Sequence, residues 1–93
     1  MRIWAAKRTV NKIIGDVVLS FDIRTKVEVD DWNPVIGALA EALNLARPVL
    51  LKKHIRDLEQ FSHTAFLSSD FMEPIDFDKL TVEIFPDQDE KRN

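Results

Sequence analysis

The chain of 93 residues contains no cysteine, so disulfide bonds and cysteine-ligated zinc or iron–sulfur centres are excluded. Small secreted domains are commonly held together by disulfides, and a cysteine-free chain of this size therefore favours the cytoplasm. The opening segment MRIWAAKR has an apolar run only from Ile3 to Ala6, which is too short for a signal peptide. No run approaches the roughly 18 apolar residues of a transmembrane helix, so we expect no membrane partner.

Glycine and tyrosine are also scarce. The two glycines, Gly15 and Gly37, stand far apart and cannot build a phosphate-binding loop. Tyrosine is absent, and the six phenylalanines follow apolar stripes rather than alternating with basic residues as in base-stacking surfaces. With a net charge of −3 and a pI near 5.3, the chain is an unfavourable partner for nucleic acid.

The N-terminal third predicts a β-hairpin. Residues 2–8 and 12–21 are strand-like, and the polar segment between them includes Asn11 as the residue expected to take a positive φ. Gly15 within the second strand predicts a β-bulge or a close approach of another chain segment. The short run Val27–Val29 is expected to extend the sheet.

Helical periodicity is clearest over residues 31–45. Asp31 or Asn33 can cap this helix, Pro34 suits its first turn, and Asn44 is a suitable left-handed stop before Pro48. A second, shorter helix is expected over residues 53–61, because apolar residues recur there at three-residue intervals.

The remaining elements complete one domain. Residues 49–51 predict a short strand, residues 62–78 an ordered loop held by phenylalanine rings, and residues 79–85 a strand with alternating inward side chains. The expected fold is α+β: one mainly antiparallel sheet of about four strands with both helices packed on one face. The domain is expected to span residues 1–86, followed by a polar tail over residues 87–93.

No catalytic constellation is recognisable. The two candidate general bases are His54 and His63, and no nucleophile, base and orienting group can be named from their spacing. His54 and Asp57 would share a helix face, which leaves a small enzyme with a His–carboxylate pair as an alternative. No metal-ligand motif or cofactor motif is present, so we expect neither a metal site nor a cofactor.

A local basic cluster offers a second alternative, an anion or nucleic-acid site. Its members lie within ten residues of one another and comprise Arg47, Lys52, Lys53 and Arg56. The competing interpretation is a solvated helix face that pairs with nearby carboxylates, and this interpretation is favoured.

The leading hypothesis is a non-catalytic module of the cytoplasm that binds another protein or itself, for instance as a homodimer. A small core with many rings gains stability when a partner covers apolar area. Large rings are also the residues that contribute most to protein interfaces. The candidate contact residues are therefore four aromatic side chains, to the extent that they are exposed: Trp4, Trp32, Phe66 and Phe71.

Several short segments in a fixed order carry a family likeness along nearly the whole chain. They are MRIW at the start, Lys12–Ile14, Asp16–Val18, Ala42–Leu45, Arg47–Leu51, the residues Ile55, Phe61, Thr64 and Phe66, Asp70–Phe71, Pro74–Asp78 and Leu80–Ile84. In these segments the chain resembles a family of small uncharacterised proteins of Gram-positive anaerobic bacteria, a domain of unknown function. None of the segments is a catalytic motif, so the resemblance implies no activity, ligand or partner.

Overall fold

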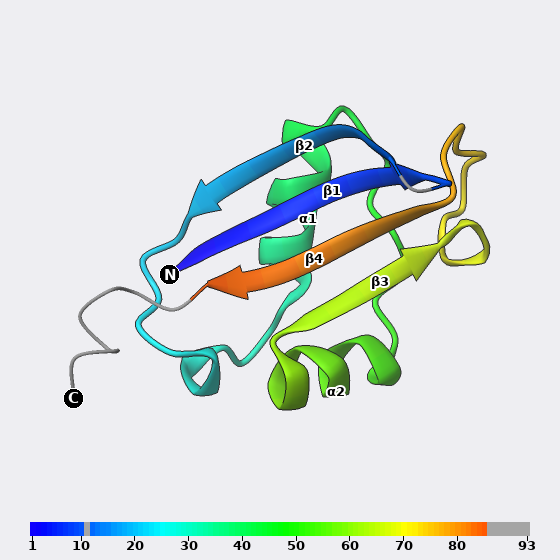
Figure 1. Cartoon of the computed structure of the whole chain (residues 1–93). Coiled ribbons are helices and arrows are strands. Elements are labelled where there is room, and N and C mark those ends of the chain that lie inside the picture. Colours follow the sequence, from blue (N-terminus) through cyan, green and yellow to red (C-terminus); the bar gives the residue numbers. More distant parts are fainter. Residues whose placement is uncertain (11, 86–93) are drawn as a thin grey trace.

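The computed structural model describes residues 1–10 and 12–85, which form one open antiparallel sheet with helices on one face (Figure 1). The strands follow the order β2-β1-β4-β3 across the sheet. Their bounds are Arg2–Thr9 for β1, Lys12–Ser20 for β2, His63–Leu67 for β3 and Lys79–Phe85 for β4. The predicted α+β class, with about four antiparallel strands and two helices, is confirmed.

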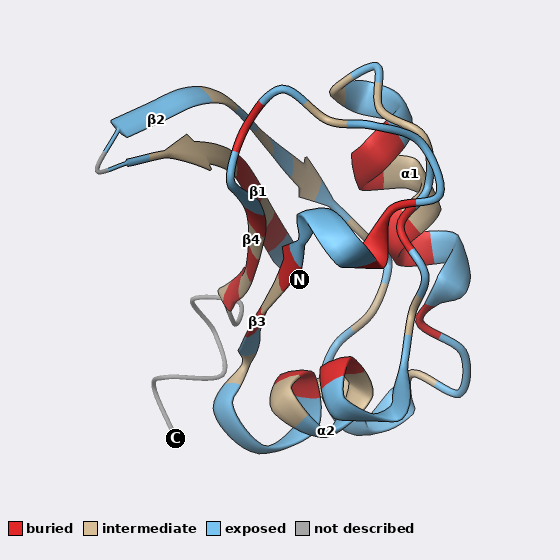
Figure 2. Cartoon of the chain, turned by 90° about the vertical axis from the view of Figure 1, so that its right-hand side faces the viewer, coloured by how far each residue is buried: buried red, intermediate tan, exposed pale blue. Residues whose placement is uncertain are grey.

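Two α-helices lie on the same face of the sheet (Figure 2). The first, α1, covers Asn33–Ala42, and the second, α2, covers Lys52–Phe61. Two short 3-10 helices, η1 (Lys26–Glu28) and η2 (Ser68–Asp70), lie in the connections. The hydrophobic core fills the space between the sheet and the helices.

The choice of core residues follows from the alternation of side chains along the strands. Alternate residues of β1 and β4 point at the helices, so Ile3 stands opposite Ile84 and Ala5 opposite Val82. From the helices, Leu39 and Leu58 are fully buried against them. The intervening residues of each strand form the other face of the sheet, which no helix covers (Figure 2).

Helix α1 is shorter than the predicted range 31–45, because its C-terminus closes in a Schellman motif. Asn44 adopts a left-handed conformation with φ of 58°, as the sequence predicts. The N–H of Leu45 then donates to the carbonyl of Ala40 (2.8 Å), and the N–H of Asn44 donates to Glu41 (3.0 Å). These two bonds satisfy terminal carbonyls and end the helix at Ala42.

Three expectations about local structure are wrong. Residues 49–51 form no strand, because the N–H of Val49 donates to the carbonyl of Asp70 (2.7 Å) and this segment runs on into α2. The predicted loop 62–78 begins with strand β3, in which Thr64 and Phe66 point into the core. Residues 26–28 form η1 instead of extending the sheet.

The hairpin of β1 and β2 confirms the bulge predicted at Gly15. The pairing register shifts between Lys7 and Arg8, where Ile14 is the additional residue on β2. A Cβ atom on Gly15 would lie 2.8 Å from the Cε atom of Lys7, so this side chain occupies the space beside the glycine. The predicted turn residue Asn11 and the predicted tail lie outside the described residues.

Candidate functional site

The structure separates the four candidate contact rings into two groups. Trp32, Phe66 and Phe71 are 2%, 0% and 8% exposed and belong to the core, so these three do not meet the condition of exposure under which they are candidate contact residues. Their apolar area is already buried between sheet and helices, where it stabilises the fold and is unavailable to a partner. Trp4 alone lies on the uncovered face of the sheet and is partly exposed.

Trp4 is held in place by its neighbours on that face. Its Nε1 donates a hydrogen bond of 2.9 Å to the Oδ2 of Asp16 on β2. The guanidinium of Arg8 lies 5.5 Å from the centre of the indole, and the ring of Phe85 on β4 lies 6.4 Å away. The indole is therefore fixed by groups from three of the four strands rather than free to adapt to a ligand.

Strand β2 forms an uncovered edge of the sheet and is nine residues long (Figure 1). Its side chains are unusually apolar for an exposed edge: Val18 is 53% exposed, Ile14 50% and Ile13 44%. On the helical side, Val17 and Leu19 pack against the core but stay partly exposed. Such an edge is a template for pairing with another chain.

The direction in which the backbone groups of β2 point follows from the pair Met1–Phe21, which extends the β1–β2 ladder by one position. Met1 and Phe21 exchange both backbone bonds, from Phe21 N to Met1 O (2.8 Å) and from Met1 N to Phe21 O (3.1 Å). In an antiparallel ladder the residues that exchange bonds alternate with residues whose N–H and C=O point away. The outward groups of β2 therefore belong to three residues: Asp16, Val18 and Ser20.

The opposite edge, β3, is five residues long and is accompanied by α2 (Figures 1 and 2). The hydroxyl of Thr64 donates to the Oδ2 of Asp57 on the helix (3.0 Å), and the N–H of Ile84 donates to Ser62 O (2.8 Å). Leu67, at the end of the strand, is 47% exposed. This edge is therefore short and flanked by its own helix.

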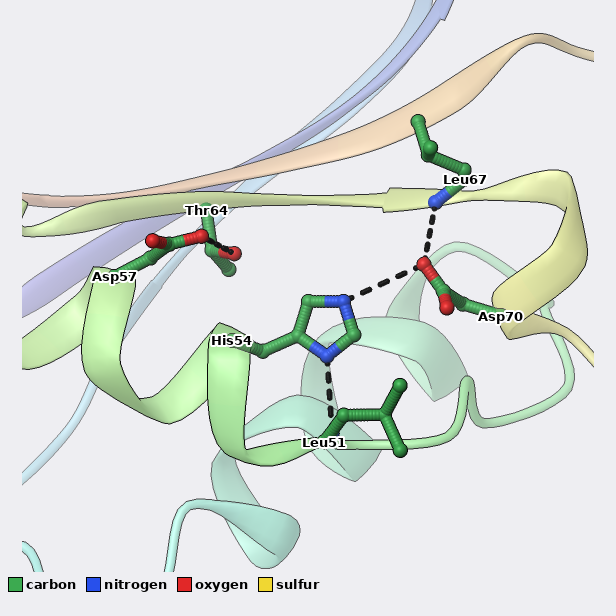
Figure 3. A network of polar contacts seen from close by, with 6 residues as sticks. All are labelled: Leu51, His54, Asp57, Thr64, Leu67 and Asp70. Atoms are coloured by element: carbon green, nitrogen blue, oxygen red, sulfur yellow. Dashed lines mark hydrogen bonds and ion pairs between the residues drawn. The ribbon is translucent and has the colours of Figure 1, made fainter.

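Beneath β3 lies a buried histidine–carboxylate pair (Figure 3). The Nδ1 of His54 accepts the N–H of Leu51 (2.9 Å), which places the ring proton on Nε2. Nε2 lies 3.3 Å from the Oδ2 of Asp70, which also accepts the N–H of Leu67 (2.9 Å). Each side chain thus accepts a hydrogen bond from a backbone N–H at the start of a helical segment, His54 at α2 and Asp70 at η2.

The setting of this pair is structural rather than catalytic. His54 and Asp70 are 1% and 6% exposed, and the imidazole lies 4.2 Å from the ring of Phe66. Burial lowers the pKa of His54, while the carboxylate of Asp70 acts in the opposite direction. Asp57, the partner that the sequence suggested for His54, is engaged by Thr64 instead. Because the pair is enclosed, a substrate has no access to it.

An open depression of about 670 Å³ lies around β3, and its lining residues come from β1, β3, β4 and α2. Its lining mixes cations and carboxylates, including Arg8, Lys79, Asp57 and Glu83, and it also contains the exposed His63. The depression therefore presents side chains of both charge signs, and no unpaired buried polar atom of the described residues lies in its lining.

The basic cluster is spread over two elements. Lys52, Lys53 and Arg56 are exposed on α2. The guanidinium of Arg47 lies instead on α1, so close to Gly37 that a Cβ there would meet it at 2.6 Å. The anion-site alternative stays a prediction.

Across residues 1–10 and 12–85, no group of three His, Asp or Glu side chains is placed to hold a metal ion. In the same part of the chain, every helix is too short or too polar to cross a membrane.

The sequence predicts no order of the strands across the sheet, so it does not identify β2 as an exposed edge. The last strand, β4, is interior, between β1 and β3. A signal for β2 existed in the β-branched run from Ile13 to Val18, which supplies apolar residues to both faces of the strand. Comparison with protein-family models, with curated proteins and with solved structures finds no match, so the family resemblance stays a prediction.

Proposed function

We propose that this domain is a non-catalytic interaction module that binds an extended polypeptide as an additional strand along β2. The observation that carries the proposal is the nine-residue edge itself, with outward backbone groups at Asp16, Val18 and Ser20. Recognition by strand addition uses main-chain hydrogen bonds for affinity and alternate side chains for selectivity. Within this proposal the domain acts in the cytoplasm, where a cysteine-free chain is at no disadvantage.

The side chains of β2 support this mode of binding. An added strand would cover Val18 and the partly exposed Leu19 from the side, each on a different face of the sheet. Burial of apolar area contributes about 25 cal/mol per Å², and each net backbone hydrogen bond contributes about 0.5–1.5 kcal/mol. Lys12 and Asp16 are the only charged residues of β2, so little charge opposes the approach of another strand.

The test is an NMR titration of the labelled full chain with a nine-residue peptide of alternating valine and threonine. We expect the backbone amide signals of Asp16, Val18 and Ser20 to shift, either with added peptide or with rising protein concentration. Val18→Lys should abolish these shifts. Leu67→Lys is the matched control, because Leu67 is similarly exposed and lies on the same face at the opposite edge.

Two outcomes would overturn the proposal. One is the absence of any shift at the three β2 amides under both conditions. The other is an equal response of the β3 amides, which would show that the peptide attaches to any strand edge.

A further inference from the structure

We infer that the strand added to β2 is the β2 strand of a second copy of this chain, paired antiparallel about a two-fold axis at Val18. The inference rests on the proposed function and names its partner. It would join the two sheets into one continuous sheet of about eight strands, with both uncovered faces on the same side.

The position of the axis follows from the regular part of the strand. From Gly15 to Phe21, β2 and its extension pair with β1 without interruption, whereas the bulge at Ile14 breaks the pattern before Gly15. Two identical segments overlap over their full length only when the middle residue faces itself. The middle residue of this segment is Val18, which is also its most exposed apolar side chain.

The direction of the backbone groups agrees with this axis. When Val18 faces its counterpart, Asp16 of each chain stands opposite Ser20 of the other. These are the residues whose N–H and C=O point outward, so three opposed pairs can exchange about six hydrogen bonds. A register that placed these residues opposite residues already bonded to β1 would make no such hydrogen bonds.

The side chains that meet across the axis are compatible. Val18 meets Val18 on the uncovered face, and Val17 meets Leu19 on the helical face. Gly15 would stand opposite Phe21, an arrangement in which an aromatic ring covers the exposed backbone of a glycine. By contrast, an axis at Asp16 would place two carboxylates directly opposite each other, which is destabilising.

The experiment uses single-cysteine variants, because the chain has no cysteine of its own. Opposed residues of a bonded antiparallel pair have Cα atoms about 5.5 Å apart, within the range that a disulfide spans. We expect Val18→Cys to form a covalent dimer under mild oxidation. Ser20→Cys is the matched control: its counterpart would lie about 14 Å away along the strands and should not cross-link.

Light scattering from micromolar to millimolar concentration completes the test. The unmodified chain should give a dimer mass that falls to a monomer mass on dilution. Val18→Lys should weaken the dimer at least about tenfold, since it opposes two ammonium groups.

The outcomes separate the two proposals. A monomer at every concentration, with β2 amides that still respond to the peptide, would overturn the second copy as partner and leave strand addition intact. A monomer without any β2 response would overturn both. A dimer that cross-links through Ser20→Cys but not through Val18→Cys would overturn the register.

Discussion

The two edge strands of the sheet differ in length and in what lies beside them. β3 is short, and α2 lies along it, joined by the Thr64–Asp57 hydrogen bond and anchored by the buried His54–Asp70 pair. β2 is nearly twice as long, and in the described residues no further strand pairs with its outer side. An unpaired edge strand can pair with other chains and so promote aggregation. Proteins usually cover such a strand or place charged residues on it. The sheet therefore has a protected edge, β3, which its own helix flanks, and an open edge, β2, whose outer side pairs with no strand of the described residues.

The largest effect is expected from removing the anchor of the protected edge. His54→Ala should lower the free energy of unfolding by about 2–4 kcal/mol, because it leaves a cavity beside Phe66 and a buried carboxylate at Asp70 without its partner. Urea denaturation measures this loss.

His63→Ala is the control for that measurement, since His63 is exposed in the same part of the molecule and should change stability by less than about 0.5 kcal/mol. If His54→Ala cost no more than the control, the buried pair would not be the anchor of this edge.

The next effect concerns position along the open edge. Val18→Lys should weaken self-association at least about tenfold, whereas Ile13→Lys, beyond the bulge, should weaken it less than about threefold. Leu67→Lys, on the protected edge, should leave the dissociation constant unchanged.

Sedimentation equilibrium on the three variants would measure this order. Equal weakening by all three substitutions would indicate a general effect of added positive charge, and the contrast between the edges would disappear.

Sequence patterns could predict the elements whose signal is local. The period of two in residues 79–85, the helical stripe of residues 53–61 and the left-handed stop at Asn44 each depend on neighbours within a few residues. The short strand β3 was missed because only Thr64 and Phe66 point into the core, and two buried positions make a weak alternation.

The candidate site was harder to predict, because an edge is defined by the order of strands. Nothing local to residues 79–85 indicates that β4 lies between β1 and β3 while β2 is left outside. The contact between His54 and Asp70 likewise joins two turns that are brought together only by the folded chain. Exposure of Trp4 and burial of Trp32 depend on the face of the sheet on which each ring lies, which composition does not reveal.

Acid should loosen the protected edge selectively. Burial lowers the pKa of His54 below its ordinary value of 6.5, although Asp70 and Asp57 counteract this and Lys53 adds to it. Below pH 6.5 the His54 side chain binds a proton more readily in the unfolded chain than in the folded chain. The contribution of His54 to the free energy of unfolding is therefore fully present above pH 6.5 and is lost as the pH falls below it. Protonation would also put a proton on Nδ1, which now accepts the N–H of Leu51.

Amide hydrogen exchange at neutral and mildly acidic pH tests this selectivity. We expect faster exchange at low pH for amides of α2 and β3, with little change for β2 amides bonded to β1. In His54→Gln the difference between the two edges should vanish. A uniform acceleration across the sheet in the unmodified chain would contradict a local cause.

The smallest effect is expected on the uncovered face, next to the open edge. Trp4→Phe removes the hydrogen bond from Nε1 to Asp16 and weakens the contact with Arg8, both at the surface. Net contributions of such bonds are about 0.5–1.5 kcal/mol, and solvent exposure puts this case at the low end. Asp16→Asn, which keeps an acceptor for the indole, should retain more stability than Trp4→Phe in the same urea titration. If Trp4→Phe instead weakened self-association as strongly as Val18→Lys, the interface would extend from the edge across the uncovered face, and the indole would be part of it.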